Sequence, residues 1–202
     1  MSNFYSGSEF VSQDFCGEDF SDLDITGAKF SDCSFSGADF RNVNLVSCVF
    51  ENCNFNISDF SGADINRSQF LNCNFESANL FAAVFTSCKI SGTSFYKSEL
   101  GGTSFAGCTM IYSSFIGADL RKQDFSGSVL KGTDFADCNL KNSKFNNSDL
   151  SNCIFRGADL SGANLSDTKT DDSDFTNAKF HKTKIDLNMA CYLAESIGCI
   201  IN

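Results

Sequence analysis

The sequence predicts an all-β solenoid that coils with four sides to each turn. Every position from Phe10 to Ile185 whose number is a multiple of five carries a bulky apolar residue, with Thr170 as the single exception. These 36 positions hold 21 of the 23 phenylalanines, together with 9 Leu, 4 Ile and 1 Met. A period of five fits neither the strand period of two nor the helical period of 3.6, so the chain has to turn a corner in every repeat.

A second column of residues, two positions before each bulky one, holds mainly Ala, Cys, Ser and Thr. If each pentapeptide forms one side of a square coil, twenty residues complete a turn and each residue stacks on the one twenty positions later. Stacked turns would then pair as strands about 4.8 Å apart and enclose both columns in a dry core. The repeat over residues 10–185 therefore predicts roughly nine turns.

Two features depart from this pattern. The segment 166–172 weakens it most and contains Thr170, so we expect a distorted turn there. The least typical residues of the small column are Glu18, Leu23, Val43 and Gln123.

The two ends of the coil need covers, because an open end exposes apolar surface and unpaired backbone groups. Residues 1–9 precede the repeat and are expected to form an N-terminal cap. Residues 186–202 predict a short helix followed by an apolar tail, with Asp186 suited to cap its start and Gly198 to end it. This segment either seals the last turn or joins two chains end to end.

Composition predicts a single soluble domain. One uninterrupted repeat fills most of the 202 residues, and the chain contains no proline that would mark a linker. Apolar residues recur at period five and never form a membrane-spanning run. Residues 1–9 lack the basic and apolar features of a signal peptide, so we expect a cytoplasmic protein.

We expect no cofactor, no metal and no enzymatic activity. Eight of the 11 cysteines lie in the small column, where Ala, Ser and Thr also occur, which predicts buried reduced thiols. The only histidine, His181, is isolated, and no serine has a plausible histidine partner. A convex rod also offers carboxylates no pocket that would shift their pKa values.

Charge favours a cationic partner over nucleic acid, because the net charge of −10 would repel phosphates. Stepping by twenty through the positions directly before the bulky column shows one acidic face. We call the six carboxylates on it the acidic column: Asp19, Asp39, Asp59, Glu99, Asp119 and Asp159. Stacked like charges repel, which favours a functional role, but Asp at this position can also bond its own turn. Both interpretations remain open.

The repeat resembles that of the pentapeptide-repeat proteins, whose pattern is A-(D/N)-L-x-x. Examples here are Ala38-Asp39-Phe40 and Ala118-Asp119-Leu120. That family forms a right-handed quadrilateral β-helix, so the resemblance implies this fold for residues 10–185, followed by a short C-terminal α-helix.

The C-terminal segment, with Lys184-Ile185, Leu193 and Ile197-Gly198, is similar to the ending of the quinolone-resistance group of that family, Qnr and MfpA. In that group the terminal helix forms a two-fold dimer, and the acidic rod mimics duplex DNA on gyrase. The resemblance implies a homodimer whose interface is formed by Leu187, Ala190, Leu193, Ala194, Ile197 and Ile200.

The same resemblance implies that the acidic column binds DNA gyrase or topoisomerase IV and modulates it or protects it from quinolones or related poisons. Two loops that project from the coil matter for gyrase protection by the Qnr proteins, and this repeat has no insertion that would form them. The alternative is a scaffold whose flat faces bind an unrelated protein.

Overall fold

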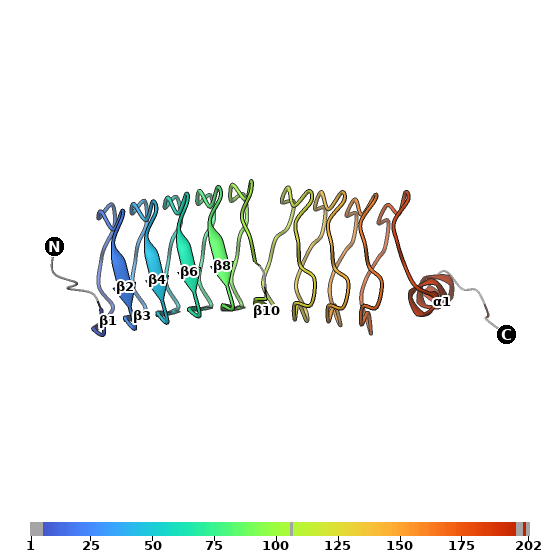
Figure 1. Ribbon diagram of the computed structural model, residues 1–202, viewed down its shortest axis with the longest axis horizontal. Coiled ribbons are helices and arrows are strands. Elements are labelled where there is room, and N and C mark those ends of the chain that lie inside the picture. The colour runs from blue at the N-terminus through green and yellow to red at the C-terminus, as the bar shows by residue number, and fades with distance from the viewer. Residues whose placement is uncertain (1–5, 106, 197–199, 201–202) are drawn as a thin grey trace.

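The computed structural model describes residues 6–105, 107–196 and 200. The chain winds into a long rod that starts at β1 and ends at a single helix, α1, at the opposite end (Figure 1). Each turn lies beside the next along the rod.

Two parallel sheets run along the first turns of the rod. One sheet contains β1, β3, β5, β7, β9 and β10 in this order, and the other contains β2, β4, β6 and β8. The described strands have three residues each: β1 Glu9–Val11, β2 Asp24–Thr26, β3 Lys29–Ser31, β4 Asn44–Val46, β5 Val49–Glu51, β6 Asp64–Asn66, β7 Gln69–Leu71, β8 Val84–Thr86, β9 Lys89–Ser91 and β10 Thr109–Ile111.

The pairing confirms the predicted turn of twenty residues. Glu9 pairs with Lys29 in the first turn, and Asn164 pairs with Lys184 in the last. Three-residue strands mark about the first five turns, and single-residue bridges carry the same pairing to the end of the repeat. The chain is therefore a four-sided β-helix, as the period of five predicts, and it has the right-handed quadrilateral form that the resemblance to the pentapeptide-repeat proteins implies.

The corner of each side lies two residues after the bulky position, where the backbone is left-handed. The φ angle at these corners is positive, for example 54° at Asn42 and 70° at Gly62. Asn, Asp and Gly tolerate this conformation better than other residues, which explains their frequency there. Stacking adds a second constraint, because a Cβ at Gly62 would come within 2.6 Å of Asn42 Oδ1.

Phenylalanine rings fill the core in stacks that follow the axis of the rod. Phe30 stacks on Phe50 of the next turn at 5.0 Å between ring centroids and meets Phe35 of the adjacent side edge-on at 5.2 Å. Offset stacks and edge-to-face pairs are the arrangements that aromatic rings prefer. The rings thus pack against one another both along the rod and around each turn.

The small column lies inside the coil and bonds to the preceding turn. Thr103 Oγ1 donates to Leu80 O at 2.8 Å, and Cys138 Sγ donates to Phe115 O at 2.9 Å. The eight cysteines of this column are buried, as predicted. Burial raises the pKa of the Cys138 and Cys153 thiols to about 12.

The prediction of a distorted turn at residues 166–172 is wrong. Thr170 keeps the place of a bulky residue and is 8% exposed. Turn-to-turn bonds run through the segment, from Leu150 N–H to Lys169 O at 2.8 Å and from Asn152 N–H to Asp171 O at 2.7 Å. The backbone ladder holds the turn regardless of the side chain inside it.

The N-terminal end of the coil reaches into the segment predicted as a cap. Gly7 N–H already donates to Thr26 O at 2.8 Å, and Thr26 N–H donates to Ser6 Oγ at 2.9 Å. Residues 1–5 lie outside the described part, so the cap prediction for that portion of residues 1–9 stays a prediction.

The helix α1, Leu187–Ser196, lies against the last turn. Asp186 caps it, because its Oδ1 accepts the Met189 N–H at 2.9 Å while its Oδ2 accepts the Asp167 N–H at 2.6 Å. Met189 is only 2% exposed, and the Tyr192 hydroxyl donates to Ser173 O at 2.6 Å. The helix therefore seals the coil. Gly198, its predicted end, lies outside the described residues.

Candidate partner-binding surface

The acidic column stands on one face of the rod in the order that stepping by twenty predicts. Asp19 pairs with Asp39, and Asp39 pairs with Asp59 in the turn above. Asn79 links this group to Glu99, and Asn139 links Asp119 to Asp159 in the same manner. The column ends where Asp159 pairs with Lys179.

Every carboxylate of the column also bonds its own turn. In each case one carboxylate oxygen accepts the backbone N–H two residues later, at distances from 2.8 Å for Glu99 to 3.3 Å for Asp119. The other four bonds belong to Asp19, Asp39, Asp59 and Asp159. Asn79 makes the same bond at 3.0 Å, so a neutral amide holds this turn equally well. The turn explains an Asx-type residue at the position and leaves the charge unexplained.

Basic neighbours neutralise part of the column. Arg41 Nε donates to Asp39 Oδ1 at 2.9 Å, and an Arg121–Asp119 ion pair at 2.7 Å repeats this arrangement. The ammonium group of Lys141 lies 3.2 Å from Asp159. Exposed pairs of this kind contribute about 0–1 kcal/mol each. In the part of the chain that the structure describes, the remaining column members, Asp19, Asp59 and Glu99, form no ion pair.

Hydrogen bonds lower the pKa of several carboxylates in the column. The Ser21 hydroxyl and N–H lower the pKa of Asp19, and the guanidinium of Arg41 lowers the pKa of Asp39. The guanidinium of Arg121 likewise lowers the pKa of Asp119.

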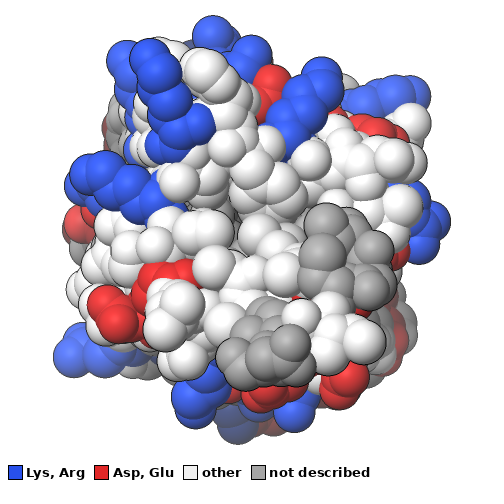
Figure 2. All heavy atoms as spheres, turned by 90° about the vertical axis from the view of Figure 1, so that its right-hand side faces the viewer, with Lys and Arg blue, Asp and Glu red and all other residues white. Residues whose placement is uncertain are grey.

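Net charge is unevenly distributed along the rod, which the sequence analysis missed although a simple count reveals it. Residues 1–100 contain 13 acidic and 5 basic side chains, whereas residues 101–202 contain 12 and 10. Figure 2, which looks onto the C-terminal end, shows Lys and Arg side chains around the rim and few charges near its centre. The acidic field is therefore strongest towards the N-terminal end.

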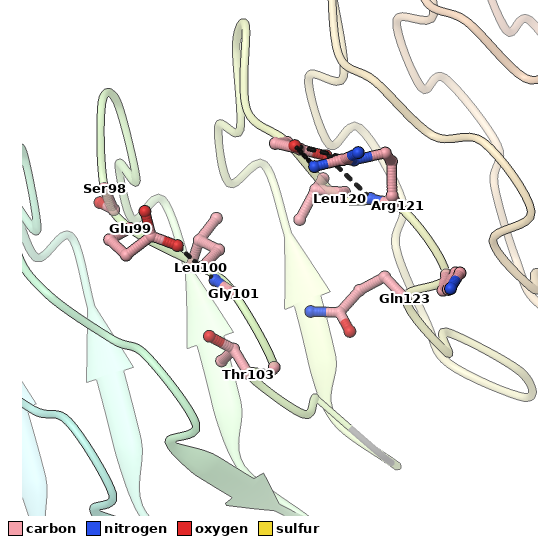
Figure 3. Close-up of a pocket in the computed structure, with 11 residues that line it drawn as sticks. Ser98, Glu99, Leu100, Gly101, Thr103, Leu120, Arg121 and Gln123 are labelled. Carbon is pink, nitrogen blue, oxygen red and sulfur yellow. Dashed lines mark hydrogen bonds and ion pairs between the residues drawn. The ribbon is translucent and has the colours of Figure 1, made fainter.

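A cleft interrupts the acidic column, which the sequence analysis did not predict. Among the described pairs, none joins Glu99 to Asp119, although every other step of the column is bridged. The cleft has a volume of about 730 Å³ and is lined by residues 98–103 and 119–123 (Figure 3). It divides the column into a longer and a shorter part.

The predicted dimer residues fall into two groups. Leu193 packs against the core, and Ala190 and Ala194 are half-buried on the helix. Leu187 and Ile200 are 77% and 87% exposed and contribute nothing to sealing the coil. Ile197 lies outside the described residues.

The metal-binding residue types are not gathered into a site in the described ranges. His181 is exposed, and no set of three or more His, Cys, Asp or Glu in these ranges is placed to hold a metal ion. The helix that the structure describes is too short to cross a membrane.

Two family models match the chain over most of its length. A model described as "Pentapeptide repeat region" matches residues 23–87 and 78–152, and one described as "Pentapeptide repeats (8 copies)" matches residues 158–187. The chain belongs to the pentapeptide-repeat family. No curated protein sequence matches this pentapeptide-repeat protein.

Solved structures of QnrB1, described as a plasmid-mediated fluoroquinolone resistance protein, have the same fold. A trypsin-treated variant is 19% identical with a TM-score of 0.80, and the match covers 96% of this pentapeptide-repeat protein and 97% of that chain. Full-length QnrB1 is 19% identical with a TM-score of 0.65, over 95% and 98% of the two chains. At this identity the likeness shows the fold alone.

Proposed function

We propose that this pentapeptide-repeat protein is a dimeric DNA mimic that binds a type II topoisomerase, chiefly DNA gyrase, through its acidic column. Binding would modulate the enzyme or protect it from quinolones or related poisons. The observation that carries the proposal is the alignment of like charges on one face of the rod, where neutral Asn79 shows that the turn needs no charge.

Electrostatics explains why such a face suits a DNA-binding enzyme. Duplex DNA presents about one negative charge per 1.7 Å of axis. The column is sparser, but on each side of the cleft its members repeat at a spacing of one or two turns. A basic DNA-binding surface is attracted to such a row at long range and is held by many weak contacts.

The likeness to QnrB1 supports the same proposal, because it extends over nearly the whole of both chains. QnrB1 is described as a fluoroquinolone resistance protein, and we propose a related role for this chain. Because its repeat has no insertion, the faces of the coil would make the gyrase contact in this proposal.

The exposed residues of the C-terminal end support a dimer. Leu187 and Ile200, both in the C-terminal segment, are exposed to solvent, and the C-terminal end of the rod carries few charges near its centre (Figure 2). Joining two copies there would bury these side chains and leave the more acidic N-terminal halves outermost. The mimic would then be twice as long as one rod.

The test is gyrase supercoiling with the purified protein titrated in, with and without ciprofloxacin. The key variant replaces four column residues with Asn: Asp39, Asp59, Asp119 and Asp159. A matched control makes the same charge change on other faces by replacing four residues with Asn: Asp24, Asp64, Asp124 and Asp149. We expect the wild type and the control to affect gyrase and the column variant to lose most of this effect.

The alternative is a scaffold that binds an unrelated protein. A scaffold would leave gyrase unaffected in all three forms while each remained folded, and this outcome would contradict the mimic. Competition with duplex DNA separates the two further, because only a mimic is displaced from gyrase by DNA.

A further inference from the structure

The cleft is a local loss of backbone pairing. One turn before it, Leu80 N–H donates to Glu99 O at 2.8 Å and Ala82 N–H donates to Gly101 O at 2.9 Å. The equivalent bonds from Leu100 and Gly102 to the following turn are missing from the described backbone bonds. The bond expected from Phe105 on the adjacent face is missing there as well.

Pairing persists on the other two faces of the same turns. Phe95 N–H donates to Ser114 O at 2.8 Å, and Met110 N–H donates to Val129 O at 2.7 Å. The two turns are therefore joined along one half of their circumference and separated along the other.

Core packing shows the same local opening. The rings of Phe105 and Phe125, on either side of the cleft, have centroids 6.3 Å apart. The equivalent distance is 5.1 Å both from Phe85 to Phe105 and from Phe125 to Phe145. The gap thus reaches through the backbone into the stacked rings and closes again one turn later.

Gln123 supplies a physical cause. It occupies a small-column position, where its stacking neighbours are Thr103 and Ser143. A glutamine amide inside a dry core would need partners for its oxygen as well as its NH2 group, whereas the hydroxyls of Thr103 and Ser143, stacked on either side, already donate to backbone carbonyls. In the structure the side chain is half-buried and extends from its own turn across the cleft (Figure 3).

The neighbouring turn shows what a small residue does at this position. Thr103 Oγ1 donates to Leu80 O at 2.8 Å and so ties its turn to the preceding one. The equivalent acceptor for residue 123 is Leu100 O. A threonine at position 123 would have the geometry to make this bond, whereas the structure shows none from Gln123 among the described hydrogen bonds.

We propose that Gln123 is a wedge that holds two turns apart on two faces and thereby makes a joint in the rod. On the two open faces, residues 98–105 belong to the first half-rod because they pair with the preceding turn, and residues 119–125 belong to the second because they pair with the following turn. The two halves can tilt about the paired faces, which act as its axis. Gly101 and Gly102 are the only adjacent glycines in the chain and stand at the open corner, where Gly102 has a φ of +71°.

The joint does not depend on the proposed function, but it divides the acidic column between Glu99 and Asp119. A partner that contacts both parts of the column therefore contacts two surfaces whose relative angle varies.

Amide hydrogen exchange on the full-length protein tests the wedge. In the wild type, the amides of Leu100 and Gly102 should exchange at least about a hundredfold faster than those of Leu80 and Ala82. In Gln123→Thr they should slow to the rates of Leu80 and Ala82, because the turns close. If the amides of Leu100 and Gly102 in the wild type are as protected as those of Leu80 and Ala82, the turns are paired there and the proposal is overturned. Fast exchange that persists in the folded variant overturns the role of Gln123.

Two further variants guard against a general change in stability. Ser143→Gln places the same side chain one turn later, and the amides of Leu120 and Lys122, now bonded to Asn139 O and Lys141 O, should become fast. Protection of these amides in folded Ser143→Gln contradicts the wedge. Val43→Thr changes the same column far from the cleft and should leave Leu100 exchange unchanged. If Val43→Thr slowed the exchange of the Leu100 amide as much as Gln123→Thr does, that result would also contradict the wedge.

Discussion

The Asn79 side-chain amide donates a hydrogen bond to Asp59 Oδ1 across one turn, at 3.1 Å. An amide in the acidic column thus bonds both its own turn and the carboxylate stacked on it. Replacing Asp by Asn there removes charge repulsion while it retains the bonds that shape the coil.

The variant with Asn at Asp39, Asp59, Asp119 and Asp159 should therefore keep the fold. We expect its free energy of unfolding to stay within about 1 kcal/mol of the wild type, because lost ion pairs and relieved repulsion nearly cancel. Urea unfolding monitored by circular dichroism measures this. A loss well above that value would show that the carboxylates themselves hold the turns.

Gyrase binding should weaken steeply with salt. Exposed charges more than about 8 Å apart are screened at physiological ionic strength, and many contacts of this kind add up along the column. Titration of gyrase with the labelled protein at several salt concentrations gives the dependence. Affinity that is unchanged by salt would point to an apolar contact and to the scaffold alternative.

The coil could be predicted from the sequence because every repeat solves the same local problem. A bulky residue at each fifth position and a small one two places earlier leave few other ways to bury both. Asp186 could be recognised as a helix cap for a similarly local reason.

The joint could not be predicted, because it depends on a competition inside the core. Val43 and Gln123 are both too large for the small column, yet Val43 is fully buried and Gln123 lines the cleft. The two residues differ because burying Gln123 would cost the free energy of desolvating its amide, whereas Val43 carries no polar group. The spacing of residues in the sequence does not reveal this cost. The prediction for Thr170 failed in the opposite sense. A distorted turn was expected there, but the backbone hydrogen bonds of its turn persist.

Stability should decrease above about pH 9 because of the buried thiols. Burial raises the pKa of Cys138 and Cys153 from 9.0 to about 12, so the folded state holds these protons more tightly than the unfolded state. The contribution of these two thiols to the free energy of unfolding is fully present below pH 9.0 and is lost as pH rises towards 12.

Urea midpoints at pH 8 and pH 10.5 measure this effect. The double variant Cys138→Ala and Cys153→Ala should show a smaller decrease between the two pH values than the wild type, whatever its stability at pH 8. An identical decrease in both proteins would assign the alkaline loss to other groups.

Removal of the helix cap should loosen the C-terminal end. Asp186→Ala deletes the acceptors of the Met189 and Asp167 N–H groups, which should cost about 1–2 kcal/mol. Faster amide exchange confined to α1 and the last turn is the expected readout. Asp186→Asn is the matched control, because it keeps an oxygen for the Met189 N–H and should lose less.

Leu187→Glu should dissociate the proposed dimer without unfolding the rod. The Leu187 side chain is 77% exposed, so its replacement removes no core contact, and an acidic residue in the first turn suits the helix dipole. Two such carboxylates facing each other across a two-fold interface would repel, and the apolar area buried there would be lost.

Sedimentation velocity over a range of concentrations measures the expected change from dimer to monomer. Asn188→Glu introduces the same charge at the next, also exposed residue and serves as the control that should remain dimeric. Wild-type protein that stays monomeric at every concentration would remove the dimer from the proposal and leave a single rod to contact gyrase. A dimer that survives Leu187→Glu would place the interface elsewhere on the chain.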